Sequence, residues 1–131
     1  MNEVHFLTLE DLDFFHEEVL TPRQIMGYRQ LSDLQGAIGR PQTAAYYDES
    51  ADLVRIAAYY WHGIALSHGY VDGNKRTAFT SMTTFRLMNG LEFVAPDYAL
   101  GPWIENLFET DRFDLDVLDT LIRTHARPLT D

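Results

Sequence analysis

The sequence predicts an all-α fold, a single compact bundle of about six helices formed by one domain over residues 1–131. Two observations support this class. Apolar residues recur at helical spacing along most of the chain, whereas the strict alternation typical of a half-buried strand is scarce. A length of 131 residues is also enough for one hydrophobic core and too short for two.

Capping signals and apolar stripes locate the individual helices. The first is predicted over Leu9–Leu20, with Thr8 as its N-cap, Asp11 at the capping-box position and Asp13 projecting away from the apolar face. The others are predicted over Ser32–Ile38, Ala51–Ser67, Thr77–Met88, Trp103–Glu109 and Leu115–Ala126. The segment Ala51–Ser67 is apolar on nearly every side, so we expect it to be the central helix of the bundle.

Glycine and proline mark where these helices are expected to end. Gly39, followed by Pro41, closes the second helix, and Asn89-Gly90 is a strong stop after the fourth. The break at Gly101-Pro102 places the start of the next helix at Trp103. Residues 90–96 are predicted to be irregular or briefly extended.

Composition narrows the functional classes. The chain is 46% hydrophobic and contains no cysteine, so it is expected to fold without disulfides, thiolate nucleophiles or cysteine metal ligands. Its formal net charge of −10 makes nucleic acid an unfavourable main ligand. No signal peptide is evident, and no apolar stretch approaches the roughly 18 residues of a membrane span. We therefore expect a soluble cytoplasmic protein with no direct nucleic-acid or membrane partner.

Residues 68–78 read His-Gly-Tyr-Val-Asp-Gly-Asn-Lys-Arg-Thr-Ala and include Lys75, the only lysine of the chain. The backbone amides of residues 74–77 are expected to be unpaired donors at a helix N-terminus, where the helix dipole favours an anion. Lys75 and Arg76 add positive charge, Asp72 is suited to a hard cation such as Mg²⁺, and His68 to accepting a proton. Together they favour phosphate-group transfer. An ordinary capped turn explains the same residues without any ligand.

The string from His68 to Arg76 resembles the signature of Fic-domain proteins, H-P-F-x-[DE]-G-N-[GK]-R. Lysine after asparagine, followed by Thr-Ala, is similar to the Doc (death on curing) branch of toxins from toxin–antitoxin systems. The segments Phe6–Glu10 with Phe15-His16 and Ala37–Gln42 also resemble that branch. The resemblance implies a Fic/Doc-like helical fold.

The resemblance also implies a role for each matched position. His68 would be the general base that activates a hydroxyl of a target protein, and Asp72 the acid associated with Mg²⁺. Tyr70 would anchor the loop in the core. The phosphates of ATP would be bound by Gly73, Asn74, Lys75, Arg76 and Thr77.

Three departures from the wider family sharpen this expectation. Lys75 stands where AMP-transferring Fic proteins have glycine, Phe79 replaces their second arginine, and Gly69 replaces a proline. The first two are shared with Doc-type proteins, so the resemblance implies kinase-like transfer of the ATP γ-phosphate to a translation factor such as elongation factor Tu, which halts translation. AMP transfer and a catalytically weak antitoxin-binding module are the alternatives.

A partner and several further residues complete the expectations. Fic proteins are often restrained by a helix with the pattern [ST]-x-x-x-E-[GN]; this chain has no match, which implies a separate antitoxin lying across a groove near the motif. His62 lies about 240° from His68 around a helix, so a shared metal is not expected. His16 is read as structural, with a minor role in substrate binding left open, and Arg40 as a structural or rim residue.

Overall fold

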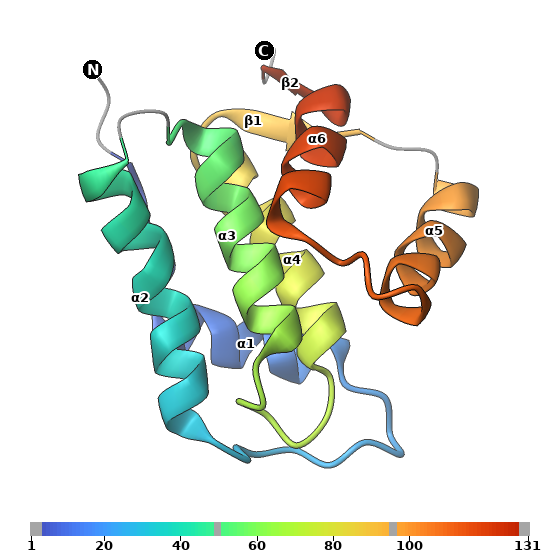
Figure 1. The fold of residues 1–131 in the computed structure, drawn as a ribbon. Coiled ribbons are helices and arrows are strands. Elements are labelled where there is room, and N and C mark those ends of the chain that lie inside the picture. The colour runs from blue at the N-terminus through green and yellow to red at the C-terminus, as the bar shows by residue number, and fades with distance from the viewer. Residues whose placement is uncertain (1–3, 49–50, 95–96, 129–131) are drawn as a thin grey trace.

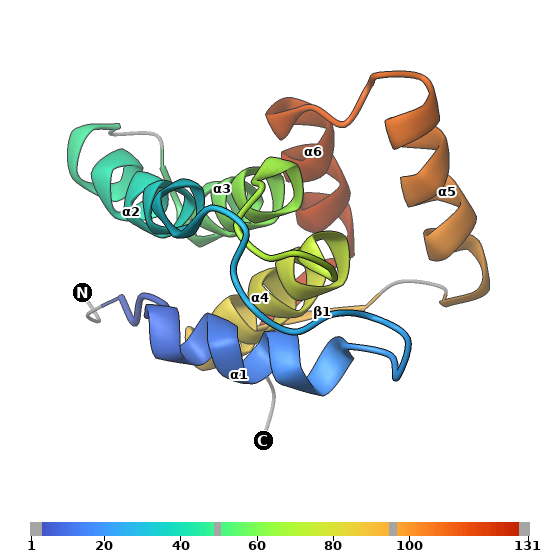
Figure 2. The same ribbon diagram turned by 90° about the horizontal axis from the view of Figure 1, so that it is seen from below.

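The computed structural model describes residues 4–48, 51–94 and 97–128, which form six helices and one two-stranded sheet. The elements are α1 (Leu9–Val19), α2 (Leu31–Tyr47), α3 (Leu53–Leu66), α4 (Asn74–Met88), β1 (Leu91–Phe93), α5 (Asp97–Glu109), α6 (Leu115–His125) and β2 (Ala126–Pro128). Helix α3 packs against α2, α4 and α6, and α1 packs against α4 (Figures 1 and 2). The predicted mostly helical bundle is confirmed. No helix in the described ranges has the length and hydropathy needed to cross a bilayer.

Helix α3 is the centre of the bundle because apolar side chains surround it. Its buried residues are Val54, Ile56, Ala57, Ala58, Tyr60, Trp61, Gly63, Ile64 and Ala65. Across the interface, α4 contributes Ala78, Met82 and Phe85, none of which has exposed surface. Burying one large apolar side chain stabilises a fold by about 1.5–3 kcal/mol. The α3–α4 interface is therefore a firm base for the loop that joins these two helices.

The N-terminus of α1 has the capping box that its sequence predicts. The Thr8 Oγ1 atom accepts a hydrogen bond from the Asp11 amide at 3.2 Å, and the Thr8 amide donates to Asp11 Oδ2 at 2.9 Å. Two amides that a helix start leaves without partners are thereby satisfied. The helix buries Leu12 and His16 on the face that packs against α4.

Helix α2 is much longer than the predicted segment Ser32–Ile38, because it continues to Tyr47. The prediction that Gly39 and Pro41 end it is wrong. Gly39 does not have the positive φ of a helix C-cap, and Pro41 lies inside the helix with its side chain buried. Proline removes one helical hydrogen bond; here packing against the core keeps the helix continuous past it.

The C-terminal third also differs from the prediction. Helix α5 begins at Asp97 instead of Trp103 and contains Pro102, so Gly101-Pro102 does not break it. The last helix ends one residue early, and residues 126–128 pair antiparallel with 91–93 as β2 and β1. A strand of three residues is too short to show an alternating pattern, so the sheet has no sequence signal. The brief extended segment predicted in 90–96 is β1; Ala95 and Pro96 lie outside the described residues.

Candidate active site

The loop of residues 67–73 joins α3 to α4 and turns directly into the N-terminus of α4. Gly73 is the N-cap and has φ +84°, a left-handed conformation that glycine adopts without strain. Helix α4 begins at Asn74, earlier than the predicted Thr77. The prediction that the Thr77 amide is unpaired is therefore wrong: it donates to the Gly73 carbonyl at 2.9 Å, and the Thr77 side chain is fully buried.

The first three amides of α4 are open. Among the described residues, the backbone N–H groups of Asn74, Lys75 and Arg76 have no hydrogen-bond partner. The side chains of Lys75 and Arg76 are exposed at the same helix end. Unpaired amides, the positive end of the helix dipole and two cations together favour binding of an anion such as a phosphate.

Asn74 holds the loop in shape with its side chain. Its Oδ1 atom accepts a hydrogen bond from the Tyr70 amide at 3.0 Å, and its Nδ2 donates to the Tyr70 carbonyl at 2.9 Å. The side-chain amide is therefore occupied within the loop. Any contact of Asn74 with a phosphate is left to its backbone amide.

His68 lies on the exposed part of this loop, beyond the end of α3. Its backbone is fixed on both sides: its amide donates to Asp33 Oδ2 at 3.2 Å, and its carbonyl accepts from the Gln30 amide at 2.9 Å. The imidazole makes no hydrogen bond within the described part of the chain. The structure thus presents a free imidazole on a fixed backbone.

Asp72 is held at two points, which leaves one carboxylate oxygen open. Its Oδ2 accepts a hydrogen bond from the Ile25 amide at 2.8 Å, and its backbone carbonyl lies 2.7 Å from Nε2 of His16. No cluster of three or more histidine, aspartate or glutamate side chains suited to a metal occurs among the described residues. Mg²⁺ commonly binds through one or two carboxylates together with phosphates and water, so the open oxygen of Asp72 fits such an ion.

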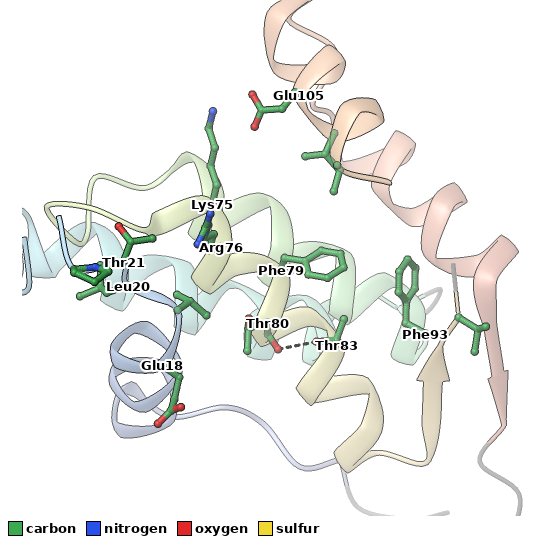
Figure 3. A pocket seen from close by; sticks show the side chains of 15 residues that line it. Glu18, Leu20, Thr21, Lys75, Arg76, Phe79, Thr80, Thr83, Phe93 and Glu105 are labelled. Atoms are coloured by element: carbon green, nitrogen blue, oxygen red, sulfur yellow. Dashed lines mark hydrogen bonds between the residues drawn. The ribbon is translucent and has the colours of Figure 1, made fainter. Parts of the chain in front are cut away.

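A groove of about 1090 Å³ begins beside this helix end and runs along α4. Residues from the end of α1 and the following loop, from α4, from β1 and from α5 line it, among them Leu20, Thr21, Arg76, Thr80, Thr83 and Ile104. Figure 3 shows Lys75 pointing from α4 toward the helix that carries Glu105. Its ammonium lies 3.9 Å from the centre of the Phe108 ring. His68 and Asp72 are not among the lining residues, so the groove adjoins the loop without containing them.

Phe79, one turn after Lys75, is part of the apolar wall of the groove. Its ring packs edge-on against Trp61 at 5.4 Å and against Phe93 at 5.9 Å, measured between ring centres. Figure 3 shows the Phe79 and Phe93 side chains on neighbouring elements of the wall. Lys75 and Arg76 are the cations of the groove lining, whereas Phe79 and Phe93 belong to its apolar wall and Glu18 and Glu105 are its acids.

The loop is anchored in the core by Tyr70, as predicted: the residue is only 2% exposed, and its hydroxyl donates to Asp13 Oδ1 at 2.8 Å. Asp13, predicted to project away from the apolar face of α1, is half-buried, and its other carboxylate oxygen accepts a hydrogen bond from the Tyr28 hydroxyl. That bond raises the pKa of Tyr28 to about 12. Burial, and then Asp13, raises the pKa of Tyr70 as well.

His16 is the residue of this region whose importance the sequence did not reveal. It is buried on α1 and reaches the backbone of Asp72, 56 residues away in the chain. The spacing of Asp13 and His16 places both on one helix face, which is the only local signal. His62, in contrast, is a half-buried histidine stacked near Phe113, and burial lowers its pKa, as expected of a packed residue.

Comparison with known proteins agrees with this geometry. The model of the Fic/DOC family matches residues 6–86. The chain is 36% identical over 85 residues to "Toxin Doc" of Mycolicibacterium smegmatis, a match that covers 60% of this chain and 65% of that protein. It is 38% identical over 66 residues to "Protein kinase doc" of Escherichia phage P1, covering 50% of this chain and 52% of that protein. The chain thus spans about half to two thirds of the length of these relatives.

The matched segment contains α1 to α3 and most of α4, and with them the whole loop and the open helix N-terminus. The helical bundle is accordingly a Fic/Doc fold. The chain belongs to the Fic/DOC family.

Proposed function

We propose that this chain is a Doc-like toxin of a toxin–antitoxin pair, a protein kinase that transfers the ATP γ-phosphate to a serine or threonine hydroxyl of a translation factor such as elongation factor Tu and so arrests translation. The observation that carries the proposal is the N-terminus of α4, where three open amides and two exposed cations lie on the loop that presents His68. The relative named "Protein kinase doc" supports the same reaction class.

The proposed step assigns one task to each group. The His68 imidazole takes the proton of the acceptor hydroxyl, whose oxygen forms a bond to the γ-phosphorus while the bond to the β-phosphate oxygen breaks, leaving ADP. The amides of Asn74, Lys75 and Arg76 bind the phosphate oxygens, with the two side chains adding charge. Asp72 would hold Mg²⁺, which when bound neutralises phosphate charge. Thr77 has no direct part, because its amide is bonded within α4 and its side chain is buried.

Two side chains favour γ-phosphate transfer over AMP transfer. Lys75 places an exposed, flexible cation at the helix start, where glycine would leave the backbone free for closer approach of a phosphate. Phe79 lies against Trp61 and Phe93 in an aromatic cluster, so no second arginine is available at that position. We infer that the site binds the outer phosphates more favourably than an α-phosphate about to be transferred.

The groove supplies a surface for the proposed antitoxin. Its lining combines apolar side chains, including Phe79, Phe93 and Ile104, with the cations Lys75 and Arg76 at the start of α4 and with the acids Glu18 and Glu105. A partner segment with apolar residues and an acidic group is complementary to that surface and would block the phosphate site at the same time. We further propose that residues 1–131 form one domain, with a cytoplasmic site of action.

Label transfer tests the reaction. The protein is incubated with bacterial lysate and ATP labelled at either the γ- or the α-phosphate. Label from the γ position alone is expected; label from the α position would indicate AMP transfer, and no label from either would favour an antitoxin-binding module without activity.

A pair of histidine variants tests the base. His68→Ala should lose transfer, by roughly 10²–10⁴-fold for a general base, without unfolding the domain. His5→Ala is the matched control, because His5 is exposed and bonds through its backbone to Asn89 at the opposite end of α4. Full transfer by His68→Ala would refute the assignment.

A further inference from the structure

The ring of His16 makes three contacts with the loop that leads into α4. It lies parallel to the Tyr70 ring, with 3.7 Å between ring centres and 5° between planes. Its Nε2 is 2.7 Å from the Asp72 carbonyl oxygen. A Cβ atom at Gly73 would be 3.4 Å from its Cδ2, so the ring also lies against the N-cap of α4. His16 is only 3% exposed, so its ring is shielded from water while it makes these contacts.

The polar contact has a defined direction. A carbonyl oxygen only accepts hydrogen bonds, so Nε2 of His16 must carry the proton. The bond orients the peptide group between Asp72 and Gly73. On one side of that peptide the chain carries the Asp72 carboxylate, and on the other it turns at Gly73 into the open amides of α4. Rotation of this single peptide would move both parts of the candidate site.

Asp13 supports the same loop one turn earlier on α1. Its two carboxylate oxygens accept hydrogen bonds from the hydroxyls of Tyr28 and Tyr70, and the Tyr28 and Tyr70 rings are stacked. The Tyr70 ring is thus held at its hydroxyl by Asp13 and on its face by His16. Helix α1 therefore contacts the loop through two residues one turn apart, Asp13 and His16. Of these two, only His16 bonds to the backbone of Asp72.

We propose that His16 is a positioning residue for phosphate transfer, acting through the Asp72–Gly73 peptide and touching neither nucleotide nor acceptor. The predicted effect of His16 on phosphate transfer rests on the proposed kinase function. Its predicted role in fixing the loop conformation does not depend on that function. Because the Asp72 carboxylate and the three open amides move together with this peptide, loss of the hydrogen bond should lower kcat and weaken ATP binding at once.

Two substitutions separate the stack from the hydrogen bond. His16→Phe keeps a flat ring on Tyr70 and removes the donor, whereas His16→Gln loses the ring and keeps an N–H group. The first readout is amide hydrogen exchange in the free protein at Tyr70, Val71 and Thr77, whose amides bond within or across the loop. For His16→Phe we expect exchange there to rise roughly tenfold relative to amides of α3, the factor for losing an ordinary hydrogen bond. His16→Gln should restore most of the protection.

The control is Leu118→Ala, which removes a buried side chain of α6 away from the loop. When compared at the same loss of overall stability as His16→Phe, Leu118→Ala should leave the exchange rates of the three loop amides unchanged relative to amides of α3. Wild-type exchange in His16→Phe, or the same loop pattern in Leu118→Ala, would overturn the proposal. If His16→Phe fails to fold, the ring nitrogen chemical shifts of wild-type His16 still test the proposal. A proton on Nδ1 in place of Nε2 would contradict the hydrogen bond to the Asp72 carbonyl.

Kinetics then connect the loop to the reaction. Displacement of catalytic groups by about an ångström costs up to roughly a hundredfold in rate. With ATP and Mg²⁺ as probes, the kcat/KM of His16→Phe should be lower than that of the wild-type protein by roughly tenfold to a hundredfold. His16→Gln should recover part of this loss. Unchanged kcat and KM alongside a loosened loop would refute the positioning role. If wild-type protein transfers no phosphate, the kinase function fails, and exchange and ring-proton measurements still test the hold on the loop.

Discussion

Replacing Arg86 by methionine should make this protein more stable. Arg86 lies in the last turn of α4 with no exposed surface. Only its Nη2 has a partner, the Glu92 carbonyl at a long 3.3 Å, while Nε and Nη1 have none within the described residues. Burial lowers the pKa of its guanidinium. A buried cation with so few hydrogen-bond partners has lost its hydration without gaining protein hydrogen bonds or an ion pair that would compensate for the loss.

The expected magnitude follows from comparing these effects. Replacing a buried ion pair by apolar side chains of similar volume is often neutral or stabilising by about 1–4 kcal/mol, and Arg86 lacks even the attraction of a partner charge among the described residues. Against this, the favourable interaction with the C-terminal end of the helix dipole is about 0.3–1 kcal/mol. The bond to Glu92 adds about 1.5–3 kcal/mol at normal length and less at 3.3 Å. The difference leaves a net gain of up to about 2 kcal/mol.

Urea unfolding followed by circular dichroism measures this gain. Arg123→Met is the matched control, because Arg123 is half exposed and pairs with Asp52 and Asp119. Loss of those surface ion pairs should cost at most about 1 kcal/mol. The two variants should therefore shift the urea midpoint in opposite directions, at unchanged slope. A loss of more than about 1 kcal/mol in Arg86→Met would show that Arg86 has a hidden partner, such as buried water, and would refute the reasoning.

Two further predictions use matched positions in the same way. Gly69→Ala should destabilise the protein by about 1–3 kcal/mol, because the added Cβ would lie 2.7 Å from Leu34 Cβ. Gly36→Ala should stabilise it by about 0.5–1 kcal/mol, because a Cβ there meets nothing within 4 Å. Thermal unfolding midpoints that shift in the same direction for both variants would contradict this prediction. The raised pKa of Tyr28 stabilises the fold fully below pH 10.0, and this contribution is lost as pH rises to about 12. Tyr28→Phe should therefore be less stable at neutral pH and lose less stability over that interval, and parallel stability curves would contradict the assignment.

The parts of the fold that could be predicted are those determined by local signals. The Thr8–Asp11 capping box and the apolar surface of α3 need only neighbouring residues, and both are present. The failures have a common cause. Pro41 and Pro102 are local signals for a helix end, yet both lie inside helices. Strand β2 is formed only by pairing with β1. Tertiary packing overrides local preference at these positions, and no short stretch of sequence contains that information.

The candidate site divides along the same line. The open amides of Asn74, Lys75 and Arg76 could be expected from the sequence, although the helix was predicted to begin only at Thr77 and the Thr77 amide is bonded. The support of that loop comes from Asp13 and His16, which are 57 and 56 residues from Tyr70 and Asp72, the loop residues that they contact. Asp13 was predicted to project away from the apolar face of its helix, because acids are usually exposed. Only the folded chain brings two tyrosine hydroxyls to it.

The position of Lys75 in the structure does not oppose its proposed use. Its ammonium rests over Phe108, a contact of about 0.5–1 kcal/mol at an exposed site. A hydrogen bond from an ammonium to a phosphate is roughly twice as strong as a neutral one, about 1.5–3 kcal/mol. A nucleotide phosphate at the start of α4 would therefore draw Lys75 away from Phe108 at small cost. Phe79 has no such alternative, because it carries no charge and its ring packs edge-on against Trp61 and Phe93. Under the proposed kinase reaction, the movable cation Lys75 would contact an outer phosphate, and Phe79 would offer no charge to an inner one.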